Sequence, residues 1–226
     1  MAFVTPLLVW GVVNADLWGE IYGISEAAKV STFLIAIAPV VAVSSAVNAW
    51  RLTPFLAASR ARSAWATLLP GTGLSALVGV VVIILGAWLR AGSPTVWWYV
   101  LAPTLIATVA WSAIGALLGV SLRPLIGWPI ALLGPFLLLT QTLSVADPRW
   151  RHLTGAWFGC CQANRTLAPG MAAATALLWA SILATALAAV WAWDRVAPRR
   201  LAVISVGLAA CLVVLTAGRA LDAAAP

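Results

Sequence analysis

The side chains with the most reactive chemistry lie in one polar stretch, residues 146–169, between two long apolar runs. This stretch holds His152, Cys160 and Cys161. Catalysis by a cysteine nucleophile needs a base within hydrogen-bond reach and a third group that orients the base. The histidine precedes the first cysteine by eight residues and no orienting group is apparent. We therefore expect no Cys/His catalytic pair. Adjacent cysteines cannot fill a tetrahedral zinc site without further ligands nearby, so no metal site is predicted.

Three states remain open for Cys160 and Cys161. They can form a strained vicinal disulfide, bond to another chain, or remain thiols. We favour thiols, because neighbouring cysteines rarely adopt the geometry that a disulfide requires. The stretch 146–169 mixes arginines and aromatic residues. We expect it to fold back onto the outer membrane surface as short helices.

The apolar runs carry no Asp, Glu, Lys, Arg or His at mid-depth. Ion-driven transporters, voltage sensors and intramembrane metalloproteases place such groups there because their work depends on them. The chain also lacks the GxxxxGK[ST] loop that cradles nucleotide phosphates. We expect no enzyme activity and no cofactor in this chain. If the protein moves a substrate uphill, another chain must supply the energy.

The overall composition predicts an all-α, polytopic membrane protein with a single transmembrane domain over residues 1–226. Of the 226 residues, 63% are hydrophobic and 8% charged, and the mean hydropathy is +1.03. Such a chain cannot present a soluble surface. The net charge is +7. The basic residues are scattered singly between apolar runs, which favours contact with membrane lipid over binding of nucleic acid.

Seven apolar runs approach or exceed the roughly 20 residues that cross a bilayer. They cover residues 2–18, 30–50, 66–88, 97–122, 124–145, 170–193 and 201–220. The first is short and carries Asn14 and Asp16, so a span and an interfacial helix both remain open. Six to seven spans are therefore expected. Proline predicts a break in the third run at residues 70–73, and kinks in the fourth and fifth at Pro103, Pro129 and Pro135.

The short loop 51–63 carries Arg51, Arg60 and Arg62 and no acid. Short basic loops remain in the cytoplasm, which predicts a cytoplasmic (inner) membrane protein with this loop inside and residues 146–169 outside. Most of the 14 tryptophans lie at the ends of runs, where indoles favour the headgroup region. Trp111 and Trp179 lie mid-span instead. There, helix packing or a lipid-facing position is favoured over contact with a substrate.

Small residues within the runs predict close helix contacts. Gly115 and Gly119 form a GxxxG face in the fourth run. Such faces let backbones approach closely. Packing inside the chain is the favoured interpretation. Contact with a second membrane subunit is the alternative.

The layout resembles the membrane subunit of a type-2 ABC exporter, of the kind found in high-GC Gram-positive bacteria. The residues that carry this likeness are the loop 51–63 between the second and third spans, the tight turn 121–124 between the fourth and fifth, and the stretch 146–169 between the fifth and sixth. The runs 38–51 and 60–70 look like permeases of this family. The seventh run exceeds the six spans that the family usually has.

The resemblance implies a cytoplasmic coupling helix and a re-entrant outer segment. Residues 52–62 would rest in a groove of a separate ATPase subunit, which binds ATP and magnesium. The implied contact residues are Arg51, Leu52, Phe55, Arg60 and Arg62. A second permease subunit, of the same or a related chain, would complete the exporter, and an extracytoplasmic protein could bind the outer loop. The alternative function is a non-transporting membrane scaffold that anchors a larger complex, in which the basic loop would serve only as a topological signal.

Overall fold

The computed structural model describes residues 26–58, 64–91, 98–141, 153–155, 169–191 and 207. Over these residues the chain is all-helical and contains no strand. It forms five long helices: α2 (Glu26–Ala58), α3 (Ala64–Ala91), α4 (Trp98–Ser121), α5 (Pro124–Gln141) and α7 (Pro169–Trp191). All five are long and apolar enough to cross a membrane. The prediction of an all-helical chain with several helices long and apolar enough to span a membrane is thus confirmed for this part of the chain.

The five helices coincide with five of the seven apolar runs predicted from the sequence. The runs 2–18 and 201–220 lie outside the described residues, apart from Gly207. This glycine is helical and buried, and a Cβ at its position would overlap the side chain of Thr185 on α7. At this point the last apolar run packs directly against α7.

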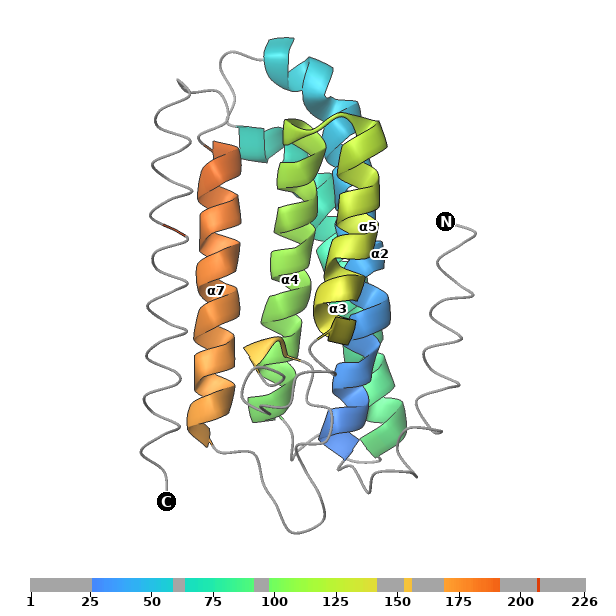
Figure 1. The fold of residues 1–226 in the computed structure, drawn as a ribbon, viewed down its shortest axis with the longest axis vertical. Coiled ribbons are helices and arrows are strands. Elements are labelled where there is room, and N and C mark those ends of the chain that lie inside the picture. The colour runs from blue at the N-terminus through green and yellow to red at the C-terminus, as the bar shows by residue number, and fades with distance from the viewer. Residues whose placement is uncertain are drawn as a thin grey trace.

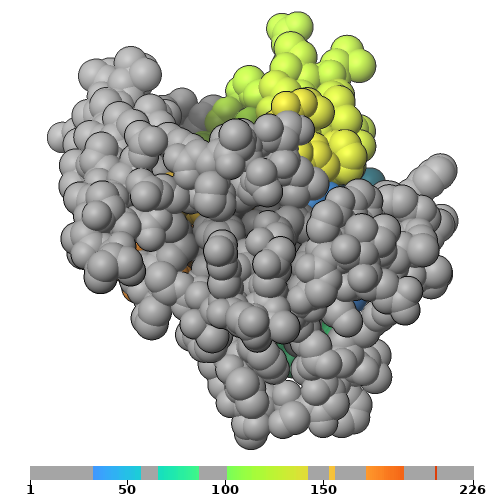
Figure 2. Space-filling view, turned by 60° about the horizontal axis from the view of Figure 1, so that its bottom comes forward, coloured from blue at the N-terminus to red at the C-terminus, as the bar shows by residue number. Residues whose placement is uncertain are grey.

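Helices α2 and α4 form the centre of the bundle (Figure 1). In each of them 61% of the span is buried by other parts of the protein, against 39% in α7, 28% in α3 and 22% in α5. Helix α4 contacts both α2 and α7. The face of α5 forms an exposed ridge in the space-filling view (Figure 2). Its large side chains, including Leu125, Leu133 and Phe136, are exposed, as expected where lipid is the solvent.

The closest helix contact joins α4 to α2. A Cβ at Gly115 would overlap the carbonyl oxygen of Ala42, and one at Gly119 would overlap that of Ala46. Both alanines are fully buried. The backbones therefore meet with almost no side chain between them, as small residues permit in membrane bundles. The GxxxG face of α4 is used within the chain.

The predicted break at residues 70–73 is wrong, because α3 runs unbroken from Ala64 to Ala91. Pro70 is the seventh residue of α3, so it removes one backbone hydrogen bond without ending the helix. The Thr72 hydroxyl donates to the Leu68 carbonyl at 2.8 Å, which adds a bond beside the proline. A Cβ on Gly71 would lie 3.3 Å from the Asn48 Cβ. The glycine thus lets α3 pass close to α2. Pro103, Pro129 and Pro135 also lie inside continuous helices.

Candidate functional site

Residues 51–58, which belong to the predicted loop 51–63, are helical and form the last part of α2. We call them the α2 tail. Leu, Phe and Ala favour helix here over loop. Pro54 removes one backbone donor, and the Thr53 hydroxyl adds a bond to the Ala49 carbonyl at 3.1 Å. The tail is therefore continuous with α2.

The α2 tail has two different faces. Leu52 is half-buried and Leu56 is 5% exposed, and both pack against a cluster from α2, α3, α4 and α7. Arg51 and Phe55 are exposed, the phenyl group to 63%. Residues four apart share a helix face, so each pair forms one side of the tail. One side fixes the tail to the bundle, and the other presents a cation and an aromatic ring outward.

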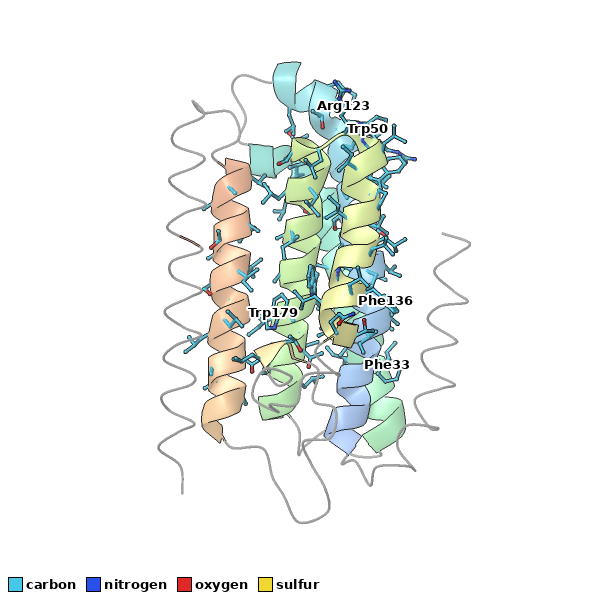
Figure 3. The ribbon with its side chains drawn as sticks, viewed as in Figure 1. Phe33, Trp50, Arg123, Phe136 and Trp179 are labelled. Carbon is cyan, nitrogen blue, oxygen red and sulfur yellow. The ribbon has the colours of Figure 1, made fainter. Side chains whose placement is uncertain are left out.

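A second arginine lies at the same end of the bundle. Arg123 is exposed in the turn between α4 and α5, where its carbonyl accepts from the Gly127 amide at 2.8 Å. Figure 3 shows Arg123 and Trp50 together at this end, while Trp179 and Phe33 lie in the opposite half. The rings of Trp50 and Trp128 meet edge to face with their centroids 5.6 Å apart, which joins α2 to α5 at this end of the bundle. This end of the described bundle is therefore cationic and braced by aromatic packing.

Several sequence-predicted site residues lie outside the described residues. These are Arg60, Arg62, His152, Cys160 and Cys161. Among the residues that are described, no three His, Cys, Asp or Glu side chains come together as a metal site. Of the five residues assigned to the docking segment, the structure brings Arg51, Leu52 and Phe55 onto the α2 tail.

A buried hydrogen-bond chain joins the three helices α2, α4 and α3. The hydroxyl of Ser112 donates to the Thr72 carbonyl at 2.8 Å, and the Ser45 and Ser112 hydroxyl oxygens are 2.8 Å apart. A serine has one hydroxyl hydrogen. Because Ser112 uses its hydrogen on the carbonyl, Ser45 must be the donor to Ser112. All three residues are buried, so this chain fixes how the central helices sit against each other.

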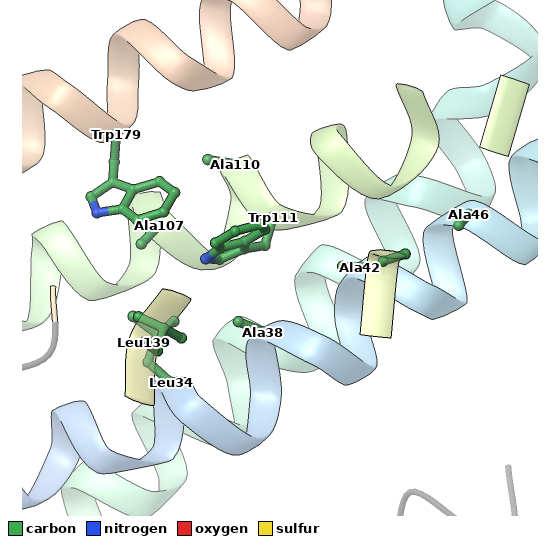
Figure 4. Packing of buried hydrophobic residues seen from close by; sticks show 10 residues of the cluster. Leu34, Ala38, Ala42, Ala46, Ala107, Ala110, Trp111, Leu139 and Trp179 are labelled. Carbon is green, nitrogen blue, oxygen red and sulfur yellow. The ribbon is translucent and has the colours of Figure 1, made fainter. Parts of the chain in front are cut away.

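Two tryptophans are buried between α4 and α7. Trp111 and Trp179 lie with ring centroids 5.4 Å apart and planes tilted by 52°. They belong to a core cluster that otherwise contains mostly alanines and leucines (Figure 4). The prediction that these two side chains serve helix packing is confirmed, and the lipid-facing alternative is wrong.

The connection between α5 and α7 enters the bundle at residues 153–155. Leu153 is 3% exposed. A Cβ on Gly155 would lie 3.4 Å from Leu34 and 3.9 Å from Ala107. Leu34 lies one residue and Ala107 six residues inside the apolar spans Phe33–Leu56 and Leu101–Ser121, so residues 153–155 pack near one end of these spans.

The sequence analysis did not identify this hydrogen-bond chain. Ser45, Thr72 and Ser112 come from three separate runs, and no spacing indicates that they meet. The sequence analysis did not single out Gly155 either. Its backbone has φ of +80°, a conformation that glycine adopts easily, and a lone glycine in a loop gives no signal of this.

Comparisons of the chain with protein-family models, with curated proteins and with solved structures found no match.

Proposed function

We propose that this chain is the membrane-spanning permease subunit of an ATP-driven exporter in the cytoplasmic membrane. The observation that carries the proposal is the two-sided α2 tail, with Leu52 and Leu56 on the bundle and Arg51 and Phe55 facing outward. A rigid helix end that offers a cation and an aromatic ring suits a groove in a soluble partner. The resemblance of the sequence to type-2 ABC permeases makes that partner an ATPase subunit.

In this proposal the partner's acidic side chains pair with Arg51, and with Arg60 and Arg62 further along the segment. ATP and magnesium bind to the partner. Closure of two ATPase subunits draws together the tails of two permease chains. Because the tail is continuous with α2, and α2 contacts α3, α4 and α5, the movement reaches the centre of the bundle.

The remainder of the exporter arrangement belongs to the same proposal. Residues 2–18 and 201–220 would add one or two spans, giving six to seven. The contact of Gly207 with Thr185 of α7 supports a span from the last run. A second permease chain, the same or related, would complete the path, and membrane lipid would cover the exposed face of α5.

The test is purification of the tagged full chain in mild detergent, with identification of copurifying proteins and an ATPase assay. An ATPase subunit should copurify with the wild type. Arg51→Glu combined with Phe55→Ser should reduce its recovery and activity at least tenfold. Arg90→Glu, at the opposite end of α3, is the matched control and should leave both unchanged.

Two results would refute the proposal. One is full ATPase recovery with the doubly substituted tail. The other is copurification of membrane or extracytoplasmic proteins without any ATPase, which would favour the scaffold function instead.

A further inference from the structure

Two buried tryptophans leave their only polar atom without a hydrogen bond. Within the described residues, the Nε1 atoms of Trp111, Trp179 and Trp128 are buried without a partner; Trp128 lies apart from the other two, against Trp50. The side chains are 7% and 3% exposed, so water does not compensate. A buried donor without an acceptor costs about 1 to 3 kcal/mol. Two such donors on adjacent rings therefore mark a place where the apolar core lacks an acceptor.

The two nitrogens border the same region of the core. Figure 4 shows the Trp111 nitrogen on the side of its ring that faces Ala107 and Leu139. The Trp179 nitrogen lies 3.6 Å from where a Cβ on Gly155 would be, and a Cβ on that glycine would also contact Ala107. The donors from α4 and α7 thus meet near Ala107, beneath residues 153–155.

We propose that Trp111 and Trp179 bind an uncharged oxygen acceptor, the carbonyl of an ester or amide, carried by a lipid-like molecule in the membrane. An indole nitrogen can only donate, so the ligand must accept. The ring faces, Leu34 and Leu139 offer apolar contact to the rest of the ligand. The side chains of this cluster around the two rings are apolar, which favours an uncharged acceptor over a carboxylate or phosphate.

Entry to this site requires movement of residues 153–155. Both nitrogens are buried, and Gly155 lies close enough to Trp179 that a Cβ on it would be 3.6 Å from the indole nitrogen. A ligand carbonyl that displaces the segment would give each donor an acceptor. The site needs no ATPase partner, so it stands independently of the exporter function.

The experiment uses the full chain labelled with 5-fluorotryptophan in detergent micelles and observed by fluorine NMR. Trp111→Phe and Trp179→Phe assign the two resonances, since each keeps an aromatic ring and loses the N–H. Methyl oleate is the probe, and 1-octadecene is the matched hydrocarbon without an acceptor. Methyl oleate should shift both resonances saturably and 1-octadecene should not. Each Phe variant should raise the dissociation constant for methyl oleate roughly twofold to tenfold, which corresponds to the loss of one hydrogen bond.

Trp50→Phe is the control variant, because Trp50 is 40% exposed at the other end of the bundle. It should bind methyl oleate as the wild type does. Equal shifts with the ester and the hydrocarbon, or unchanged affinity in both core variants, would overturn the proposal. If one Phe variant fails to fold, the other still assigns its own resonance. The comparison of methyl oleate with 1-octadecene on the wild type then still tests the proposal.

Discussion

The hydrogen-bond chain from Ser45 through Ser112 to the Thr72 carbonyl predicts a specific order of mutational costs. Ser112→Ala removes both bonds and leaves the Ser45 hydroxyl buried without its acceptor. Ser45→Ala removes one bond and leaves the Ser112 hydroxyl on its carbonyl. Interhelical hydrogen bonds in membrane bundles contribute about 0.6 kcal/mol on average, and an orphaned buried group costs about 1 to 3 kcal/mol.

We therefore expect Ser112→Ala to lower the free energy of unfolding by about 2 to 4 kcal/mol and Ser45→Ala by about 0.6 kcal/mol. The double variant should be no less stable than Ser112→Ala, because it removes the orphaned hydroxyl. The two effects are thus non-additive.

The assay is reversible unfolding in mixed micelles, followed by circular dichroism at increasing denaturing-detergent fraction. Ser75→Ala is a matched control, since its hydroxyl bonds only within α3, to the Gly71 carbonyl at 3.0 Å. It should change stability by less than Ser112→Ala does. A larger cost for Ser45→Ala than for Ser112→Ala would refute the assigned donor order. If the stability losses of the two single variants added exactly in the double variant, the hydrogen bond between Ser45 and Ser112 would be refuted.

Four further substitutions test the packing by the same unfolding assay. Gly119→Ala should lower the free energy of unfolding by about 1 to 3 kcal/mol or more, because its Cβ would meet the Ala46 carbonyl. Gly134→Ala, where nothing lies within 4 Å, should be neutral or stabilise the protein by up to about 1 kcal/mol. Equal effects of the two substitutions would contradict the close contact at Gly119. Gly155→Ala should cost about 1 to 2 kcal/mol, because φ is +80° while the surrounding space admits a methyl group; an unchanged stability would disprove the strain. Without ligand, Trp179→Phe should lower the free energy of unfolding by about 1 to 3 kcal/mol, because the cavity left by the smaller ring outweighs the removal of an unpartnered donor. A loss above about 5 kcal/mol would exceed the cost of the cavity and would mean that the N–H is bonded.

The sequence by itself determined the number and place of the described helices. Continuous apolar runs separated by short polar segments must form helices in lipid, because there each backbone group needs a hydrogen bond within its own segment. The five described helices begin and end within a few residues of the predicted runs, except where α2 continues to Ala58. Helix formation depends on neighbouring residues, so local sequence suffices to predict it.

Only the tertiary structure decided which faces meet. The GxxxG pattern indicated a close contact of Gly115 and Gly119, but not that Ala42 and Ala46 of α2 were the partners. In a bundle that is apolar inside and outside, hydrophobicity does not distinguish a buried face from one in lipid. Interhelical geometry determines the pairing of Ser45 with Ser112 and leaves the nitrogens of Trp111 and Trp179 without partners. It also determines the burial of Gly155. Residues 40 or more positions apart determine that geometry together, and no periodicity in the sequence encodes it.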